Sequence, residues 1–208
     1  EKVLPEGVRD KAYLHKTVQA IVGAICDTWE TIRAEYPALP DVGLSRDVAF
    51  ITTQELEDKY PDMTPKQRED AYLKEHPTVF LEEIGDVLKS GKKHDGRAPD
   101  YDDWQLNGDI LFWNPVLGCA FEVSSMGIRV DAKSLDEQLA KAGADDRRQL
   151  PFHRMLLAGE LPLTIGGGIG QSRLCMLLLG KAHIGEVQCS VWDDATAHTC
   201  EQAGVPLL

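Results

Sequence analysis

The spacing of apolar residues near the start of the chain predicts a long amphipathic helix. Along residues 9–36 they fall three or four positions apart, as they do on one face of an α-helix. The apolar positions are Val18, Ile21, Val22, Ile25, Trp29 and Ile32. Pro37 ends the pattern, because proline lacks the amide hydrogen that a continuing helix needs. We therefore expect one buried face and one solvated face.

Two short runs, residues 48–52 and 78–84, are apolar and rich in β-branched side chains, which is typical of strands. Between them, a threonine cap candidate before residues 55–60 indicates a short helix. Thr64, followed by proline, begins a second, charged helix that extends to about residue 76, since threonine is a good N-cap and proline suits the first turn.

The middle of the chain predicts a loop followed by a pair of strands. Residues 90–108 are polar and dense in charged and aromatic side chains, which is typical of a functional loop. Residues 110–113 and 121–130 follow as strands, joined by a connection too short for a parallel crossover. This order of elements indicates an α+β fold with one mostly antiparallel sheet flanked by helices.

The C-terminal half predicts helices on both sides of a glycine cluster. Ser134 and Glu137 fit a capping box for a helix that ends near residue 142. The further elements expected are a helix over residues 147–158, a strand, glycine cluster and helix over residues 161–180, a last strand over residues 183–192 and a loose tail from residue 193.

The composition excludes several classes of protein. With 43% apolar residues, the 208-residue chain can bury a sizeable core. Its 34 acidic residues exceed its 22 lysines and arginines, and the resulting net charge of −12 repels nucleic acid. No apolar run approaches the ~20 residues of a membrane helix, and no signal peptide is recognisable. Five scattered cysteines without a CxxC motif favour a reducing, cytoplasmic location.

Gly166, Gly167, Gly168 and Gly170 are expected in a turn between a strand and a helix, with Arg173 one turn into that helix. Glycine lets a backbone approach a ligand closely, and a helix N-terminus with a nearby guanidinium favours phosphate. No Gly-Lys-Ser/Thr follows, which excludes a P-loop, and no βαβ continuation follows, which excludes a Rossmann site. On this pattern alone, a tight turn needed only for packing, with Arg173 in a surface ion pair, is an equal alternative.

Two acidic residues lie on adjacent predicted strands. Asp109 begins one strand, and Glu122 lies amid apolar residues on the other. If both face the same side, their carboxylates converge on a site that suits a hard cation such as Mg²⁺ bound to phosphates. Most acidic side chains are merely solvated, but a glutamate between apolar neighbours favours the functional interpretation.

Glu122, Ser124, Ser125 and Arg129 share one predicted strand. Side chains alternate between the faces of a strand, so Glu122 and Ser124 fall on one face while Ser125 and Arg129 fall on the other. A β-bulge at residues 126–127 would restore a common face, and we predict a bulge there.

Four long segments, in this order, resemble the ammonia-dependent asparagine synthetases, the aspartate-ammonia ligase family. They are RAPDYDDW at residues 97–104, LNGDILFWNPVL at 106–117, FEVSSMGIRVDA at 121–132 and LPLTIGGGIGQSRL at 161–174. The catalytic domain of this family is similar to that of class II aminoacyl-tRNA synthetases. The resemblance therefore implies that fold, and it implies formation of L-asparagine from L-aspartate, ammonia and ATP.

The resemblance also implies where ATP and a metal would bind. The residues that it assigns to ATP are Arg97, Glu122, Gly168, Gly170 and Arg173, and those that it assigns to Mg²⁺ are Asp109 and Glu122. For the amino-acid substrate, Arg129 corresponds to an arginine that grips a carboxylate, here the α-carboxylate of aspartate. Asp102 is assigned to the amino group or the incoming ammonium, and Ser124 and Ser125 are further substrate-binding candidates.

In the implied reaction, ATP first converts the side-chain carboxylate of aspartate into an acyl adenylate and releases pyrophosphate. Ammonia then displaces AMP. Arg173 would offset the charge that develops on the phosphates, and Asp102 would act on the incoming ammonia. These two are therefore the expected catalytic residues.

The start of the chain and one short connection suggest missing parts. The chain begins with Glu1 rather than methionine, so we expect a single catalytic domain over residues 1–208 that lacks an N-terminal portion. In the family, that portion carries the dimer-forming element, and the resemblance implies a homodimer. The family has a longer connection after the DYDDW segment, so we also expect a loop to be missing between residues 104 and 106.

Two alternatives to the ligase stay open. One is a class II synthetase-like paralogue that passes aspartate or asparagine to tRNA, although the acidic charge and the lack of an anticodon-binding domain argue against it. The other is a non-catalytic protein that binds an amino acid or nucleotide and regulates another process. Fold alone does not separate these, because one fold hosts several functions.

Overall fold

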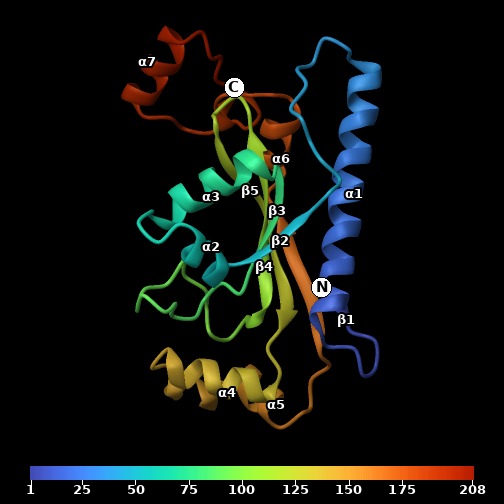
Figure 1. The fold of residues 1–208 in the computed structure, drawn as a ribbon, viewed down its shortest axis with the longest axis vertical. Coiled ribbons are helices and arrows are strands. Elements are labelled where there is room, and N and C mark those ends of the chain that lie inside the picture. The colour runs from blue at the N-terminus through green and yellow to red at the C-terminus, as the bar shows by residue number, and fades with distance from the viewer.

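The computed structural model describes residues 1–208 and contains one six-stranded sheet (Figure 1). The strands are β1 (Lys2–Val3), β2 (Ala49–Thr52), β3 (Thr78–Glu82), β4 (Asp102–Asn114), β5 (Cys119–Arg129) and β6 (Thr164–Ile169). Their order is β1-β6-β5-β4-β3-β2, and all neighbours are antiparallel except β2 and β3. This confirms the predicted α+β fold with a mostly antiparallel sheet.

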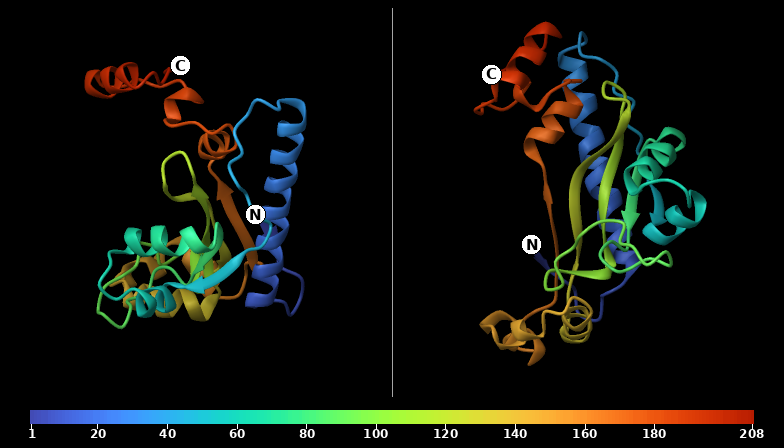
Figure 2. Two further views of the ribbon diagram at one scale, coloured as in Figure 1. Left: turned by 45° about the horizontal axis from the view of Figure 1, so that its top comes forward. Right: turned by 90° about the vertical axis from the view of Figure 1, so that its left-hand side faces the viewer.

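Helices cover both faces and one end of this sheet. The α-helices are α1 (Lys11–Glu35), α2 (Thr53–Lys59), α3 (Pro65–Glu75), α4 (Ala132–Lys141), α5 (Pro151–Leu157), α6 (Gln171–Leu178) and α7 (Asp194–Gln202), and the 3₁₀ helices are η1 (Asp145–Gln149) and η2 (Ile184–Glu186). The long helix α1 lies along one face, α2 and α3 cover the other, and α4 and α5 pack at one end (Figures 1 and 2). None of the helices combines the length and the apolar character that a membrane span requires.

The amphipathic helix predicted over residues 9–36 is confirmed within two residues at each end. The side chain of Asp10 caps α1 by accepting a hydrogen bond from the amide of Tyr13. On the buried face of the helix, Leu14, Val18 and Val22 have no exposed surface, and they pack against apolar side chains of β3, β4 and β5. This large apolar contact fixes one face of the sheet and leaves the other for α2, α3 and the site.

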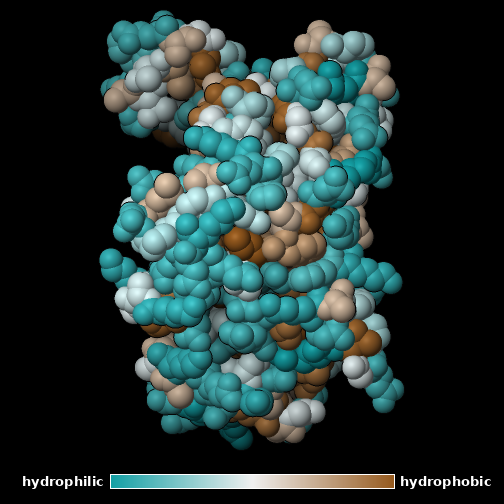
Figure 3. Space-filling model, in the orientation of Figure 1, coloured by the Kyte–Doolittle hydropathy of each residue, from teal (hydrophilic) through white to brown (hydrophobic).

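The helices on the opposite face begin at capping boxes. Thr52 and Glu55 exchange hydrogen bonds at the start of α2, and Thr64 and Gln67 do the same for α3. Both helices then pack on apolar residues of β3 and β4. They cover only part of that face, and the molecular surface seen in Figure 3 is largely hydrophilic, with hydrophobic residues in small separate groups.

The C-terminal part differs from the prediction. Residues 183–192 form the 3₁₀ helix η2 and an irregular segment instead of a strand, because the side chain of His183 caps the amide of Gly185 and bends the chain. The tail expected to be loose forms α7, which Asp193 caps through the amide and hydroxyl of Thr196. The prediction was wrong for both segments.

Two helix boundaries also need correction. The capping box of α4 consists of Asp131 and Ser134, one turn before the predicted pair of Ser134 and Glu137. The helix expected over residues 147–158 is divided into η1 and α5, because Pro151 cannot donate the backbone hydrogen bond that would join them.

The glycine cluster lies in a strand and not in a turn. Gly166, Gly167 and Gly168 belong to β6 and pair with Gly127, Met126 and Ser125 of β5. Only Gly170 lies at the junction, as the N-cap residue of α6. The backbone that we expected to loop around a ligand is therefore part of the sheet surface.

Strand β4 begins within the segment that we predicted as a loop. Asp102 pairs with Arg129, and the next pair is Asn107 with Gly127, so residues 103–106 bulge out of register. Residues 104–106, where we expect a family loop to be missing, form part of this bulge.

A buried glutamine on α4 bonds to the bulged backbone. The side-chain oxygen of Gln138 accepts from the amide of Trp104 at 2.8 Å. Its side-chain nitrogen donates to the carbonyl oxygens of Pro99 at 2.9 Å and Asp102 at 3.0 Å. Backbone groups in and beside the bulge thereby have partners, which buried polar groups require.

Replacing this glutamine tests how much the bulge depends on it. We expect Gln138→Met to lower the free energy of unfolding by roughly 2–4 kcal/mol. The three backbone groups lose their hydrogen-bond partner, while methionine keeps about the same side-chain volume as glutamine. Urea unfolding of this variant measures the effect. Gln105→Met, an exposed position on the same bulge, is the control and should change stability by less than about 0.5 kcal/mol. Equal stability of the two variants would contradict the role of Gln138.

Candidate active site

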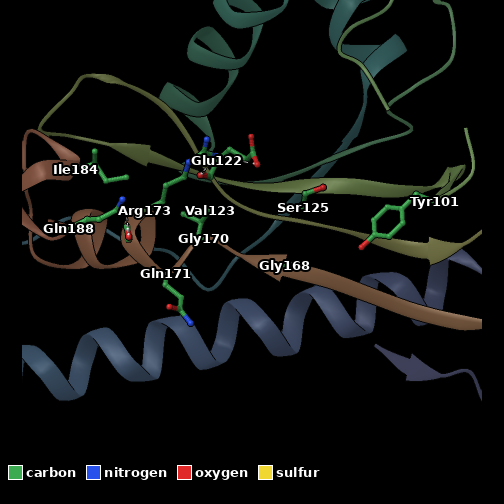
Figure 4. Close-up of a pocket in the computed structure, with 11 residues that line it drawn as sticks. Tyr101, Glu122, Val123, Ser125, Gly168, Gly170, Gln171, Arg173, Ile184 and Gln188 are labelled. Carbon is green, nitrogen blue, oxygen red and sulfur yellow. Dashed lines mark hydrogen bonds and ion pairs between the residues drawn. The ribbon is translucent and has the colours of Figure 1, made fainter. Parts of the chain in front are cut away.

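Most of the predicted site residues gather on the sheet face that α1 does not cover. A pocket of about 550 Å³ lies there, between the surface of β5 and β6 and the start of α6 (Figure 4). Its size is in the range of small-molecule sites. The residues that line it include Tyr101, Glu122, Ser125, Gly168, Gly170, Gln171 and Arg173.

A bulge in β5 brings Glu122 to this face. Ser124 pairs with Ile110 while Glu122 pairs with Leu111, so Val123 is an extra residue between them. The extra residue reverses the alternation, and Glu122 therefore lines the same pocket as Ser125. The prediction of a bulge is confirmed, but its predicted position at residues 126–127 is wrong.

The same geometry separates Ser124 from the other predicted residues. Ser124 is buried and lines a small cavity beneath α1, together with Met126. Ser125 lies on the pocket side and pairs with Asp109. The substrate-binding role that we expected for Ser124 finds no support in this position.

Each of the two predicted metal-binding carboxylates is paired with an arginine. Arg97 donates to the carboxylate of Asp109, and both side chains are largely buried. Arg173 lies 3.3 Å from the carboxylate of Glu122, and this pair is about half exposed. Figure 4 shows Arg173 and Glu122 side by side at one end of the pocket.

Burial makes Asp109 a weak acid in this structure. It raises the pKa of Asp109 from 3.8 to about 6, against the lowering effect of Arg97 and with a further upward contribution from the nearby charge of Glu122. A carboxylate in this position is costly to ionise, which favours a cation beside it.

Tyr101 lies at the other end of the pocket (Figure 4), where it contacts Arg129. The guanidinium of Arg129 lies 3.9 Å from the centre of the Tyr101 ring and donates to the Tyr101 hydroxyl at 2.8 Å. Arg129 also donates to the buried carboxylate of Asp102. Two of its nitrogens donate to one carboxylate oxygen of Glu1, at 2.8 Å and 2.5 Å. Arg129 therefore binds a structural carboxylate and a second, half-exposed one at the same time.

The charges of this cluster shift each other's pKa values. Burial is the largest effect on Arg129 and lowers its pKa, but its bonds to Glu1 and Asp102 raise the pKa above the ordinary value. Burial raises the pKa of Asp102 despite the attraction of Arg129. For Glu1, Arg129 outweighs burial and lowers the pKa. Of the two carboxyl groups bound to Arg129, only the half-exposed Glu1 therefore has a pKa below its ordinary value.

Two neighbours keep Asp102 and Arg129 in place. A methyl group at Gly127 would lie 2.9 Å from the carboxylate oxygen of Asp102, so glycine leaves the space that the carboxylate fills. Arg9 donates to the carboxylate of Asp103 at 2.6 Å and to the carbonyl oxygen of Arg129 at 3.1 Å. Segments distant in the sequence thereby hold both strands at the site.

The glycines of β6 differ in what an added side chain would meet. A methyl group at Gly166 would collide with the Glu1 carboxylate, and one at Gly167 would lie 2.5 Å from Cβ of Met126. At Gly168 it would meet no atom within 4 Å. Packing against Met126 therefore explains Gly167. At Gly166 the nearest atoms belong to the half-exposed end of the Glu1 side chain, and a side chain at Gly168 would enter the open pocket.

Several residues of the site belong to no motif that points to them in the sequence. Tyr101 has a recognisable signal, since it is an aromatic residue between acidic neighbours in a polar segment. Gln138 and Arg9 have none, because each acts on a segment far away in the sequence. The predicted residues that line the pocket are Glu122, Ser125, Gly168, Gly170 and Arg173. Asp109 is the strand partner of Ser125 and is bound to Arg97. Arg129 is bound to Asp102 and to Tyr101.

The pKa of Asp109 predicts a pH dependence of stability in metal-free buffer. Its folded-state value of about 6 exceeds 3.8, so the folded protein loses stability as the pH rises between these values, by at most about 3 kcal/mol. The Asp109→Asn variant has no carboxyl group to ionise at this position, so it does not lose this stability as the pH rises. The free energy of unfolding of the variant minus that of the unsubstituted protein should therefore increase from pH 4.5 to pH 7.5, as measured by urea unfolding in EDTA. A difference that is flat or decreases with pH would contradict the raised pKa.

Comparison with known proteins identifies the family. The family model described as aspartate-ammonia ligase matches residues 1–204. Curated relatives named aspartate–ammonia ligase include proteins of Bacillus cytotoxicus and Bacillus cereus, each 58% identical over 208 residues, and one of Bacillus thuringiensis that is 57% identical. The matches cover 100% of this chain, which spans 63% of the length of these relatives.

The fold is similar to that of class II aminoacyl-tRNA synthetases. An asparaginyl-tRNA synthetase of Entamoeba histolytica, solved in complex with asparaginyl-adenylate, matches with a TM-score of 0.60 and 17% identity, over 86% of this chain and 44% of that one. The aspartyl-tRNA synthetase of the same organism matches with a TM-score of 0.58 and 20% identity, over 90% and 41% of the two chains. These likenesses concern the fold, and the near-complete family match shows that the chain belongs to the aspartate-ammonia ligase family.

Proposed function

We propose that this chain is the catalytic domain of an enzyme that forms L-asparagine from L-aspartate, ammonia and ATP. The reaction passes through a β-aspartyl adenylate and releases AMP and pyrophosphate. The observation that carries the proposal is the pocket itself. At one end Tyr101 contacts the carboxylate-binding Arg129, and at the other lies a glycine surface with Arg173. The family match and the names of the curated relatives support it.

The nucleotide is proposed to bind over β6 and the start of α6. Gly168 leaves an open surface for it, Gly170 lies at the N-terminus of α6, and Arg173 lies beside the pocket. Backbone amides at a helix start and a guanidinium both favour phosphate. Arg97, which reaches this region through Asp109, is the second proposed phosphate contact.

Asp109 and Glu122 are proposed to hold Mg²⁺. Two carboxylates on one sheet face are the oxygen donors that this ion prefers. Both already have cationic partners, which supports the proposal of a site for positive charge. When bound, the ion would neutralise negative charge on the phosphates.

Aspartate is proposed to bind with its α-carboxylate on Arg129, at the place that the Glu1 carboxylate occupies. That contact demonstrates that a carboxylate fits there while Asp102 keeps its own bond to Arg129. Since Asp102 is buried and engaged with Arg129, we assign it the orientation of that arginine in place of contact with ammonia. Ser125, on the pocket side of β5, is a further substrate contact.

In this arrangement the β-carboxylate of aspartate attacks the α-phosphorus of ATP, and pyrophosphate leaves. Arg173 stabilises the charge that develops on the phosphates, and one such well-placed donor contributes roughly 3 kcal/mol to the transition state. Ammonia then attacks the acyl carbon and AMP leaves.

We also propose that the enzyme is a cytoplasmic homodimer.

A pair of glycine variants tests the nucleotide surface. Gly168→Val should weaken binding of a non-hydrolysable ATP analogue with Mg²⁺ at least tenfold in calorimetry and leave stability unchanged, because its Cβ meets no protein atom within 4 Å and the side chain occupies the open pocket. Gly167→Ala is the matched control: its methyl group collides with Met126 beneath α1, so it should cost roughly 1–3 kcal/mol of stability. If Gly168→Val binds the analogue normally, the proposed surface is wrong.

The activity itself is tested with the full-length protein that contains this chain. Supplied with aspartate, ATP, Mg²⁺ and ammonium but no tRNA, it should form AMP and asparagine in equal amounts. Arg173→Ala should lower kcat by about 100-fold. Arg148→Ala breaks exposed ion pairs with Asp136 and Asp145 and an exposed bond to the Asp136 carbonyl oxygen, and it should retain activity. Absence of product in a folded protein that binds nucleotide, or a requirement for tRNA, would contradict the proposal.

A further inference from the structure

Two ion pairs connect the arginines and the carboxylates of the nucleotide end. Arg97 is bound to Asp109, and Arg173 lies 3.3 Å from Glu122. The two acids contribute two negative charges and the two arginines two positive ones, so the four side chains together are neutral. A site composed of carboxylates suited to a divalent cation thus holds, in the free protein, the positive charge that such a cation would bring.

The burial of Asp109 explains why one of these arginines is needed. The side chain of Asp109 is only 9% exposed, and an ionised carboxylate at that depth is costly without a counter-charge. Arg97, itself 17% exposed, supplies the charge from the polar segment that precedes β4.

Neither arginine has other partners that would hold it in this position. The hydrogen bond to Asp109 is the only one that Arg97 makes, and its buried Nε has no partner. Arg173 has only a long contact to the carbonyl oxygen of Glu122 besides the ion pair. A guanidinium offers five donors, so both groups have unused capacity for an anionic ligand with several oxygens.

These charges discriminate between two ligands. A free divalent cation that binds Asp109 and Glu122 must displace both arginines and leaves them without partners, with a local excess of two positive charges. A metal–polyphosphate complex brings the cation for the carboxylates and the anionic oxygens for the arginines together, so every charge has a partner before and after binding.

We infer that Arg97 and Arg173 are specificity-determining residues. They disfavour binding of a free divalent metal to the carboxylate pair and favour binding of a metal–polyphosphate complex. This rests on the proposed function, which places both the metal and the phosphates at this end of the pocket. Arg97 carries the larger share, because its ion pair is buried, whereas that of Arg173 is half exposed and weakened by solvent.

The test measures Mn²⁺ binding to the full-length protein without nucleotide, from the electron paramagnetic resonance signal of free Mn²⁺. The unsubstituted protein should bind Mn²⁺ weakly, and tripolyphosphate should increase the affinity at least tenfold. Arg97→Gln should by itself bind Mn²⁺ at least tenfold more tightly, and adding Asp109→Asn to it should remove the gain.

Two further variants serve as controls. Arg97→Lys keeps the charge beside Asp109 and should bind Mn²⁺ as weakly as the unsubstituted protein. Arg147→Gln breaks another arginine–aspartate pair, with Asp100, whose carboxylate is also bonded to His153, and it should not increase Mn²⁺ binding. Thermal unfolding of each variant confirms that it is folded under the conditions of the titration.

The inference is overturned if the unsubstituted protein binds Mn²⁺ equally well with and without tripolyphosphate, a result that depends on no variant. It is also overturned if folded Arg97→Gln shows no gain. Either result in a protein that makes asparagine leaves the proposed function intact. If no variant binds Mn²⁺ even with tripolyphosphate, the proposed metal site fails together with the inference.

Discussion

The buried ion pair between Arg129 and Asp102 is the interaction on which the rest of the site depends. A guanidinium at this depth needs a counter-charge, and Asp102 supplies it from the neighbouring strand. Gly127 leaves space for that carboxylate, and Gln138 bonds to the backbone on both sides of it. Because one charge is satisfied internally, Arg129 keeps other donors for a second carboxylate, and the contact with Glu1 shows such a group in place.

At the other end of the pocket, carboxylates are again paired with arginines, but these pairs have fewer supporting bonds. Asp109 is buried beside Glu122, and its raised pKa shows that the fold stabilises this carboxylate incompletely. Arg97 and Arg173 reduce the cost through ion pairs that lack the supporting bonds of Arg129 and Asp102. One arginine is thus fixed by its surroundings and two are free to exchange partners. This difference separates the end that orients aspartate from the end that exchanges nucleotide and metal in the proposed reaction.

Local signals in the sequence were sufficient for much of the fold. The apolar period of α1 and the threonine caps of α2 and α3 act within one helix, so residues 9–36 and Thr64 could be interpreted without tertiary information. The extra residue Val123 has no such signal, since a bulge depends on how β5 pairs with β4. The glycines of β6 have the local pattern of a turn. Their pairing with β5, about 40 residues earlier in the chain, makes them a strand and leaves no local signal. Residue types and spacing indicated the glycines, Arg173, Asp109 and Glu122, and the family resemblance added Arg97 and Asp102. The structure supplied their partners, above all Tyr101 and Gln138.

The central claim is that Asp102 orients Arg129 for the carboxylate of aspartate and does not act at the nucleotide end. The most direct measurement is steady-state kinetics of the full-length Asp102→Asn variant, which keeps the shape of the side chain and removes its charge. The account predicts that KM for aspartate rises at least tenfold while the affinity for a Mg²⁺–ATP analogue stays within twofold of the original. An unchanged KM for aspartate, or an equal loss of affinity for the nucleotide, would contradict it.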